Sequence, residues 1–338
     1  MPEMTKRERV RAALRGEPVD RVPVSAWWHH FAREWEPEGL AQATFDAYRR
    51  YDWDWVKLNP RATYYAEDWG NEYERPDPPA SPKLVKAAVR FPDTLMRMKF
   101  LDPRKGAYGE QVEAIRLLRA KLGDEAFVVH TVFSPLAVVG RLMGNVDETK
   151  RYLVEHAAQM HTGLSVVAET LSVYARLCLD AGADGLFFAT VDWGTYDNLT
   201  EEQYRTFARP YDLQVLSQAQ DAAFNVLHVC RANSMLDLML DYPVHAFNWA
   251  ATLPGNLSLR DVQERTDRAV IGGLSEQGAL RHGTPSEAAA EAARAIAETG
   301  GRRFLLAPGC SIEPPPGTPE ANLDAVCETA RAAAGRRA

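Results

Sequence analysis

The sequence lacks the cysteines of a disulfide framework, since it has only four in 338 residues. It also lacks an apolar run long enough to span a bilayer, and its first residues lack the uninterrupted apolar core of a signal peptide. A long basic stretch is missing as well, and the formal net charge is −7. We therefore expect a cytoplasmic protein with reduced thiols, and we expect it to bind neither nucleic acid nor a membrane.

What the sequence does contain is a repeated order of apolar runs and longer amphipathic segments. Eight runs read as buried strands of a parallel sheet, because their apolar residues are continuous rather than alternating. These runs are 22–28, 55–58, 126–133, 185–190, 224–229, 246–251, 269–274 and 304–308. Helical patterns separate most of them, over 146–180, 200–222, 285–299 and 319–334. The alternation predicts an α/β fold, a (β/α)8 TIM barrel in a single domain over 1–338, with a helical extension at about residues 1–20.

Proline marks two loops and two helix starts. The proline-rich stretches 75–82 and 313–319 are predicted to be loops, because each leads directly into another element. Thr284 and Thr318 each precede a proline and an acidic residue, which is typical of a capping threonine. We therefore expect a helix to begin beside each of these threonines.

One imidazole and two thiols stand where predicted strands end. His228 and Cys230 lie at the end of the strand at 224–229, and Cys310 follows the strand at 304–308. The carboxyl ends of parallel strands form the edge at which α/β proteins place their chemistry. A lone His-x-Cys pair is often only core packing, but imidazole and thiolate are also ligands of Zn²⁺. We therefore predict a zinc site of His228, Cys230 and Cys310 with a fourth position open for substrate or water.

Three further residues at strand ends are candidates for acid–base catalysis. His29 follows the first predicted strand, and its imidazole titrates near neutral pH, although a hydrogen-bonded packing role is the alternative. Asp192 follows the fourth strand, where it is either a catalytic carboxylate or a loop cap. Glu276 follows the seventh strand. We take these three residues as candidate catalytic groups.

Aromatic, amide and guanidinium side chains at the same strand ends are candidates for binding the substrate. Indole rings suit a flat or cationic group, with a packed barrel mouth as the alternative. Guanidinium groups suit an anionic group of the substrate, although Arg61 could instead pair with Glu67. The predicted substrate-binding residues are Trp28, Asn59, Arg61, Trp193, Arg231, Asn248 and Trp249.

Several short motifs, spread over about residues 5–330, occur together in this sequence. They lie at 7–16, 20–24, 181–185, 248–249, 272–274, 307–312 and 318–322. By these motifs the chain resembles the uroporphyrinogen decarboxylase superfamily, and none of them would be specific alone. The resemblance implies a barrel enzyme from one of two chemical branches.

The two branches differ in the residues that follow the first two strands. Tetrapyrrole decarboxylases carry an arginine-rich segment and an aspartate there, whereas residues 27–33 hold one arginine and residues 59–61 hold no acid. A substrate with many carboxylates would need several arginine forks. The second branch, the corrinoid-linked methyltransferases, binds zinc through a His-x-Cys motif and a distant cysteine, which His228, Cys230 and Cys310 match. The chain is therefore more similar to the second branch.

Two positions depart from the methyltransferase branch. Arg231 stands where that branch usually has glycine, and its guanidinium could hold a carboxylate or phosphate of the substrate. Asn248 ends the sixth strand, where no acid is present, so a fourth zinc ligand would be Glu276 or water. Glu276 and Asp192 are also the candidates for taking the proton of a thiol substrate.

The resemblance favours a zinc-dependent methyltransferase that moves a methyl group between a corrinoid-type carrier and a thiol or related small molecule. The alternatives are a uroporphyrinogen decarboxylase-like lyase, acting on a porphyrinogen or a smaller carboxylic acid, and a non-catalytic protein that binds a corrinoid or tetrapyrrole. We recognise no corrinoid-binding domain in the chain, so a corrinoid would be supplied in trans, free or on a separate carrier protein. The oligomeric state stays open, with a homodimer as one option.

Overall fold

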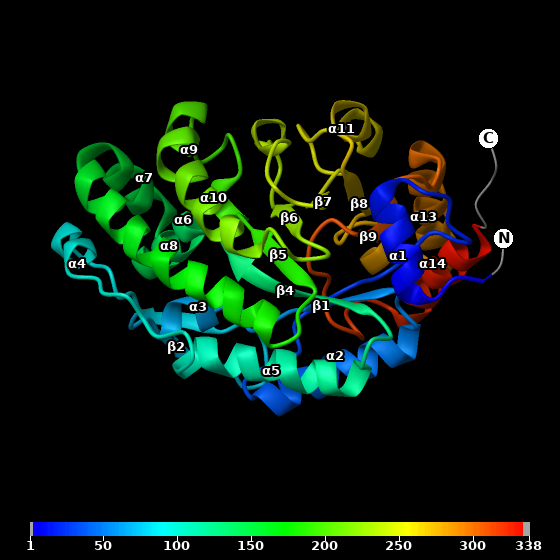
Figure 1. Ribbon diagram of the computed structural model, residues 1–338, viewed down its shortest axis with the longest axis horizontal. Helices are drawn as coiled ribbons and strands as arrows, with labels where there is room; N and C mark the ends of the chain where they lie inside the picture. The colour runs from blue at the N-terminus through cyan, green and yellow to red at the C-terminus, as the bar shows by residue number, and fades with distance from the viewer. Residues whose placement is uncertain (1–2, 334–338) are drawn as a thin grey trace.

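A computed structural model describes residues 3–333 of the chain. Its centre is a seven-stranded parallel sheet with helices packed around it (Figure 1). In sheet order the strands are β1 (Trp55–Leu58), β4 (Phe127–Phe133), β5 (Gly185–Ala189), β6 (Val226–Val229), β7 (Ala246–Trp249), β8 (Ala269–Leu274) and β9 (Phe304–Pro308). Nearly every strand residue is buried, which explains why the apolar runs are continuous rather than alternating.

The segment at 22–28, predicted as the first of eight strands, forms isolated bridges instead of a regular strand. Val24 bridges Leu306 of β9, and its carbonyl accepts a hydrogen bond of 2.9 Å from the amide of Asp54, just before β1. Pro23 has no amide proton to give to a ladder, which limits regular pairing here. The barrel prediction is thus confirmed in part: the sheet has seven regular strands, and this irregular segment hydrogen-bonds beside both edge strands.

Helices and short 3₁₀ turns fill the connections between strands. The helices are α1 (Lys6–Arg15), α2 (Pro37–Tyr51), α3 (Tyr64–Glu67), α4 (Pro92–Met96), α5 (Gly106–Leu122), α6 (Pro135–Met143), α7 (Val146–Glu155), α8 (Ala157–Asp180), α9 (Glu201–Phe207), α10 (Arg209–Leu216), α11 (Leu259–Arg265), α12 (Ala279–His282), α13 (Pro285–Thr299) and α14 (Glu320–Ala332). The 3₁₀ turns are η1 (Val191–Trp193), η2 (Ser217–Ala219) and η3 (Leu236–Met239).

Two helices predicted from the sequence are broken. The pattern at 146–180 is divided into α7 and α8 at His156, whose backbone leaves the helical region (φ −133°, ψ 39°). The pattern at 200–222 is divided into α9 and α10 at Ala208, because Pro210 has no amide proton to donate to the preceding turn. The same pattern ends in the 3₁₀ turn η2. Long apolar periodicity therefore identified the helices but not their interruptions.

The two proposed capping threonines behave differently. Thr284 caps α13, as predicted, and the structure adds a reciprocal capping box with Glu287. Thr318 does not cap α14, which begins after Pro319; its side chain is buried instead, and its hydroxyl has no hydrogen-bond partner within residues 3–333. The last predicted residue of this helix, Ala334, lies outside the described residues.

Helix α1 covers the amino ends of the strands. Val10 and Ala13 share a hydrophobic cluster with interior strand residues such as Phe127. Arg9 is buried between Asp20 and Asp54, with 2.7 Å from its guanidinium to each carboxylate. Helix α1 therefore lies at the end of the sheet opposite to the carboxyl ends of the strands.

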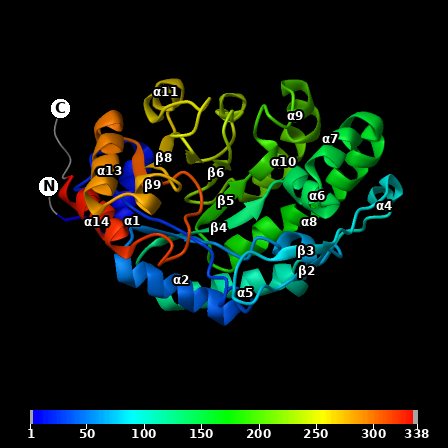
Figure 2. The ribbon, with the colours of Figure 1, turned by 180° about the vertical axis from the view of Figure 1, so that it is seen from behind.

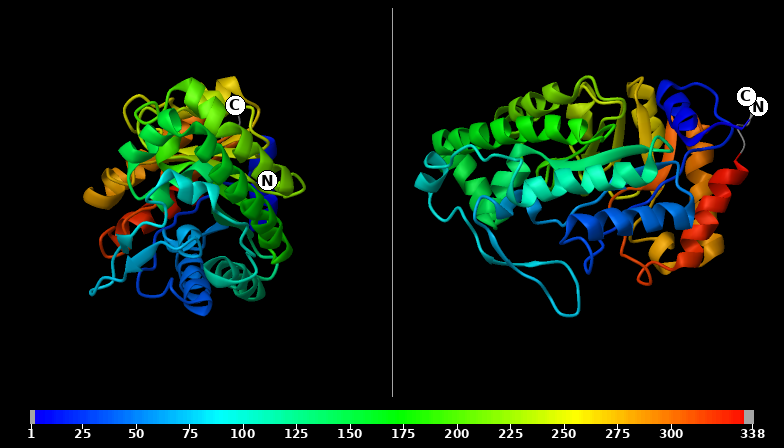
Figure 3. Two further views of the ribbon diagram at one scale, coloured as in Figure 1. Left: turned by 90° about the vertical axis from the view of Figure 1, so that its left-hand side faces the viewer. Right: turned by 60° about the horizontal axis from the view of Figure 1, so that its bottom comes forward.

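The connection from β1 to β4 carries a projecting arm that was not predicted. Strands β2 (Glu72–Glu74) and β3 (Lys83–Lys86) pair antiparallel, and the predicted loop at 75–82 joins them. This hairpin lies near α4 in Figure 2 and extends from the body in the right panel of Figure 3. Within residues 3–333, no helix is both long and apolar enough to cross a membrane.

Candidate functional site

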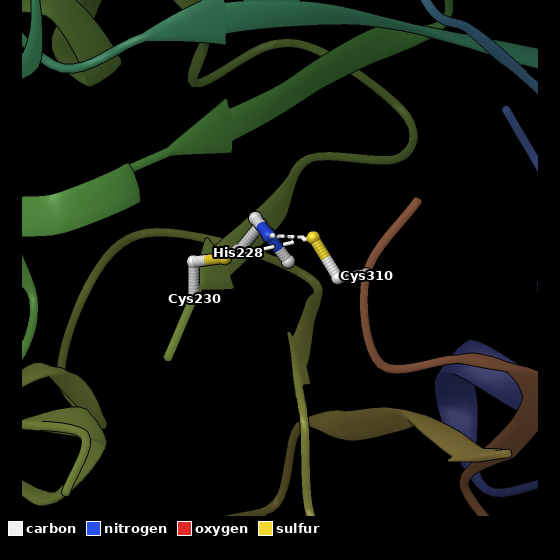
Figure 4. A group of neighbouring side chains, drawn as sticks. All are labelled: His228, Cys230 and Cys310. Carbon is white, nitrogen blue, oxygen red and sulfur yellow. Dashed lines mark hydrogen bonds between the residues drawn. The ribbon is translucent and has the colours of Figure 1, made fainter. Parts of the chain in front are cut away.

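Three potential metal ligands converge at the carboxyl edge of the sheet. His228 lies on β6, Cys230 follows that strand, and Cys310 comes from the loop after β9 (Figure 4). The two sulfurs are 3.5 Å apart, and Cys310 Sγ is 3.7 Å from His228 Nε2. All three ligand atoms lie within 4.8 Å of one another. The structure therefore brings together the three residues chosen from the sequence.

The spacing and the chemistry of these atoms fit zinc. Tetrahedral coordination, with zinc–sulfur bonds of about 2.3 Å and zinc–nitrogen bonds of about 2.0–2.1 Å, puts sulfur about 3.8 Å from sulfur and about 3.6 Å from nitrogen. The separations of 3.5 and 3.7 Å are close to these values. Two thiolates and one imidazole are ligands that zinc favours, and three protein ligands leave one position for a substrate.

Asn248 orients the imidazole of His228. Its Oδ1 accepts a hydrogen bond of 2.6 Å from His228 Nδ1, which leaves Nε2 to face Cys310. The Asn248 amide in turn donates to the carbonyls of Ile271 and Pro308, at 3.0 and 3.2 Å. An imidazole held in this way presents the unprotonated nitrogen that a metal needs. Asn248 was predicted to bind substrate, but its contacts are those of a residue that positions His228.

Backbone geometry brings Cys310 to the other ligands. Gly309 precedes it, and a Cβ atom at that position would lie 2.6 Å from Cα of Ala250. The Gly309 amide donates to the Leu274 carbonyl at 3.0 Å. Glycine therefore permits the close approach of the β9 loop to the segment after β7, which carries Cys310 over the sheet edge.

The two thiols do not have equal acidity. The hydrogen bond between their sulfurs lowers the pKa of Cys310, and the neighbouring imidazole of His228 acts in the same direction. The same bond, together with burial, raises the pKa of Cys230. One thiolate is therefore favoured over two until a cation compensates the second negative charge.

Glu276 lies close enough to this group for His228 and Cys310 to influence its ionisation. Burial raises the pKa of its carboxyl, and the nearby Cys310 acts in the same direction while His228 opposes it. The side chain is 8% exposed, and Oε2 has no hydrogen-bond partner among the described residues. A buried carboxylate with an unused oxygen suits either metal ligation or proton transfer.

Arg231 and Asp192 form an ion pair beside the ligands. The guanidinium Nε of Arg231 lies 2.8 Å from the Asp192 carboxylate. The backbone of Arg231 has φ +80°, in the left-handed region that favours glycine. A glycine would adopt this conformation without strain. Both residues were predicted as site residues, and in the structure their side chains form a salt bridge with each other.

The other predicted residues lie in packed or paired surroundings. His29 contacts the buried Glu34 carboxylate at 3.1 Å rather than the three ligands. Arg61 is 3% exposed and forms ion pairs with Glu67 and Glu110, at 2.8 and 2.6 Å. Pairing with Glu67 was the alternative to substrate binding for this residue. No hydrogen bond of His29 or Arg61 to the three ligands occurs within residues 3–333.

The three predicted indoles are largely buried. Trp28 packs edge-on against Tyr51 and Trp53. Trp193 lies so close to Gly140 that a Cβ there would be 2.5 Å from its Nε1. Trp249 is fully buried and donates to the Leu257 carbonyl at 2.8 Å. These contacts are the ones expected of a packed barrel mouth, which was the alternative to substrate stacking.

Lys57 was missed by the sequence reasoning. It lies on β1, is 6% exposed, and donates a short hydrogen bond to Oδ1 of the predicted residue Asn59. Burial lowers the pKa of Lys57 to about 7, while Cys310 and Cys230 act in the opposite direction. The available signal was a single charged residue inside an otherwise apolar strand.

Comparison with known proteins gives a consistent picture. The family model described as uroporphyrinogen decarboxylase (URO-D) matches residues 5–333. The methylcobamide:CoM methyltransferase MtbA of Methanosarcina acetivorans is 25% identical over 357 residues, with 98% of this chain and 99% of that protein covered. Uroporphyrinogen decarboxylase of Prochlorococcus marinus is 26% identical over 236 residues, with 65% of this chain and 62% of that protein covered.

A solved structure shares the fold over nearly the whole chain. A structure described as a methyltransferase from Methanosarcina mazei superposes with a TM-score of 0.84 at 23% identity. The match covers 98% of this chain and 99% of that chain.

Proposed function

The chain belongs to the uroporphyrinogen decarboxylase (URO-D) family, and within it we propose a zinc-dependent methyltransferase that moves a methyl group from a corrinoid-type carrier to a small thiol. In this proposal the segment at 22–28 serves as the eighth element of a closed barrel. The carboxyl edge of the sheet is then the barrel mouth, where enzymes of this architecture hold their active sites.

The single observation that carries the proposal is the convergence of His228, Cys230 and Cys310 within 4.8 Å. Two thiolates and an imidazole gathered at one point suit a metal that activates sulfur. The methylcobamide:CoM methyltransferase of Methanosarcina acetivorans aligns over nearly its full length, whereas the decarboxylase aligns over 62% of its own. Both observations favour methyl transfer.

The residues of the site have separate tasks in this proposal. His228, Cys230 and Cys310 hold the zinc, and Asn248 keeps His228 in the ligating tautomer. Bound there, zinc would lower the pKa of a substrate thiol and so supply the thiolate nucleophile. Glu276, with one unpartnered carboxylate oxygen, takes the proton that the thiol loses.

The methyl group is the second component of the proposed reaction. We propose that a corrinoid delivers it, free or on a separate carrier protein. Transfer then breaks the bond between the methyl carbon and the corrinoid cobalt and forms a carbon–sulfur bond. The electron pair of the broken bond stays on cobalt, so the thiolate attack is balanced without an added oxidant or reductant.

The test is a pair of assays on the same zinc-loaded preparation. Methylcobalamin with a panel of short thiols measures methyl transfer, and uroporphyrinogen measures the release of CO₂. We expect zinc-dependent methyl transfer and no conversion of uroporphyrinogen, because residues 27–33 offer only one arginine for its carboxylates. Rapid CO₂ release that persists after zinc removal, without any methyl transfer, would assign the chain to the decarboxylase branch instead.

A further inference from the structure

A cavity of about 420 Å³ lies at the end of the sheet opposite to the candidate metal site. It is formed by the end of α1, by α11 and by the turn that joins α13 to β9, and Figure 1 shows α1, α13 and β9 close together. Small-molecule sites in proteins have volumes of about 300–1,000 Å³, so this cavity has room for a small ligand. Its lining residues are Arg15, Gly16, Gln263, Thr299, Arg302 and Arg303.

The lining carries three guanidinium groups and no carboxylate. The one ion pair of Arg15 within residues 3–333 is with Glu17, at 3.9 Å, and the two side chains are 65% and 56% exposed. An exposed pair at this distance contributes little. Neither Arg302 nor Arg303 forms an ion pair with a carboxylate in the same range. The positive charge of the cavity is therefore not neutralised by close pairing, although the whole chain has a formal net charge of −7.

Arg303 forms a fixed wall of the cavity. Its guanidinium donates to the carbonyls of Thr266 and Gln263, at 2.9 Å for the second. A Cβ atom on Gly16 would lie 2.9 Å from Arg303 Cγ, so α1 ends directly against this side chain. The backbone of Arg303 has φ +46°, in the left-handed region that arginine rarely adopts. The chain thus keeps a strained backbone at the point where Arg303 is held between α1 and α11.

The neighbouring arginines have donors that the described residues do not use. Arginine near the carboxyl end of a helix is favourable in itself, which accounts for Arg303 beside α11 and for Arg15 in the last turn of α1. It does not account for Arg302. Only the backbone of Arg302 is hydrogen-bonded within residues 3–333, to Thr299 and Gln263. A guanidinium presents its donors as a planar fork that matches two oxygens of a phosphate.

We propose that this cavity binds the phosphate group of a small molecule, with Arg15 and Arg302 donating to the phosphate oxygens and Arg303 as the wall behind them. A free phosphate ion would fill only part of about 420 Å³, so the ligand is a phosphate ester or a diphosphate. Such a ligand would join the end of α1 to the turn between α13 and β9. Because these segments meet only in the folded chain, binding would also stabilise the fold.

The first experiment measures affinity by calorimetry at constant ionic strength. Pyrophosphate, ribose 5-phosphate and inorganic phosphate are titrated into the zinc-loaded protein, and ribose is the uncharged counterpart. We expect pyrophosphate and ribose 5-phosphate to bind and ribose not to bind. Arg15→Gln and Arg302→Gln should each raise the Kd about tenfold to a hundredfold, as expected for a lost charged hydrogen bond. Arg97→Gln, which removes an exposed arginine after α4, is the matched control and should leave the Kd unchanged.

The second experiment locates the bound phosphate. Hydrogen exchange with and without pyrophosphate should show slower exchange at the end of α1 and at residues 300–303. Cys310→Ala removes a candidate metal ligand and should bind pyrophosphate as tightly as the wild type, which separates this site from binding to zinc. Inorganic phosphate that binds as tightly as the other two compounds supports the site and identifies free phosphate as its ligand. The inference is overturned if none of the three phosphates binds, or if Arg15→Gln and Arg302→Gln bind them as tightly as the wild type.

Discussion

Replacing Asn248 with alanine should weaken zinc binding although Asn248 is not a ligand. The substitution removes the acceptor that lies 2.6 Å from His228 Nδ1. The imidazole then rotates more freely and its two tautomers compete, so Nε2 is presented to the metal less often. Loss of such an outer hydrogen bond typically lowers metal affinity by about 10- to 100-fold, or about 1.4–2.7 kcal/mol.

The same substitution should also lower stability, so a control is needed. Asn248→Ala leaves the carbonyls of Ile271 and Pro308 without their donor, at about 1–3 kcal/mol for an unsatisfied buried group. Asn225 is equally buried but lies just before β6, at the opposite end of that strand. It accepts from the Leu186 amide at 3.0 Å and donates to the Ala219 carbonyl at 2.6 Å. Asn225→Ala therefore removes similar hydrogen bonds far from the ligands.

The assay is competition for zinc against a chelator of known affinity, with urea unfolding of the zinc-free proteins measured alongside. We expect both alanine variants to lose stability but only Asn248→Ala to lose zinc affinity. Asn248→Asp keeps an acceptor for His228 and should bind zinc at least as well as the wild type. If Asn248→Ala and Asn225→Ala have the same zinc affinity, the imidazole is not held in the way we describe.

Three further predictions concern the ligands, an interior carboxyl and a glycine contact. Cys310→Ala should reduce the zinc content, measured by elemental analysis, from one per chain to a small fraction, whereas Cys327→Ala, in the core of α14, should retain it. Burial raises the pKa of the Asp212 carboxyl from 3.8 to about 7. Between pH 3.8 and about 7 the folded state keeps this proton and the unfolded state loses it. The free energy of unfolding therefore falls by about 1.4 kcal/mol for each unit by which the pH rises. Asp212→Asn should remove this dependence, so the free energies of unfolding of the variant and the wild type, measured in urea at pH 4–8, should change differently with pH. The same pH dependence in both proteins would contradict the prediction. Gly140→Ala should lower the free energy of unfolding by about 1–3 kcal/mol, because its Cβ would lie 2.5 Å from Trp193 Nε1, and an unchanged urea midpoint would show that the indole can move aside.

The order of strands and helices could be predicted because parallel strands are apolar on both faces. Residues 285–299, for example, carried a helical pattern and followed a capping threonine, and they form α13 as expected. The breaks at His156 and Ala208 could not be found from periodicity alone, because the apolar positions continue through them. The hairpin of β2 and β3 was missed for another reason: its strands are short and mostly exposed, so they carry no apolar run.

The candidate site was also predictable only in part. Ligand types at strand ends were enough to group His228, Cys230 and Cys310, since the carboxyl ends of parallel strands meet at one edge. The roles of their neighbours depend on side-chain direction. Asn248 turned out to contact His228, and Arg231 to contact Asp192, which a list of strand ends cannot show. Lys57 escaped notice because a lysine inside a strand reads as an exposed residue until its burial is known.

Zinc K-edge X-ray absorption of the zinc-loaded protein, before and after adding a short thiol, tests the central claim most directly. We expect a ligand set with two sulfurs and at least one nitrogen in the protein alone, from Cys230, Cys310 and His228. After addition of the thiol, a third sulfur at about 2.3 Å should appear. Fewer than two sulfurs at the start, or a ligand set that does not change with saturating thiol, would contradict the proposal that this site binds and activates a thiol on zinc.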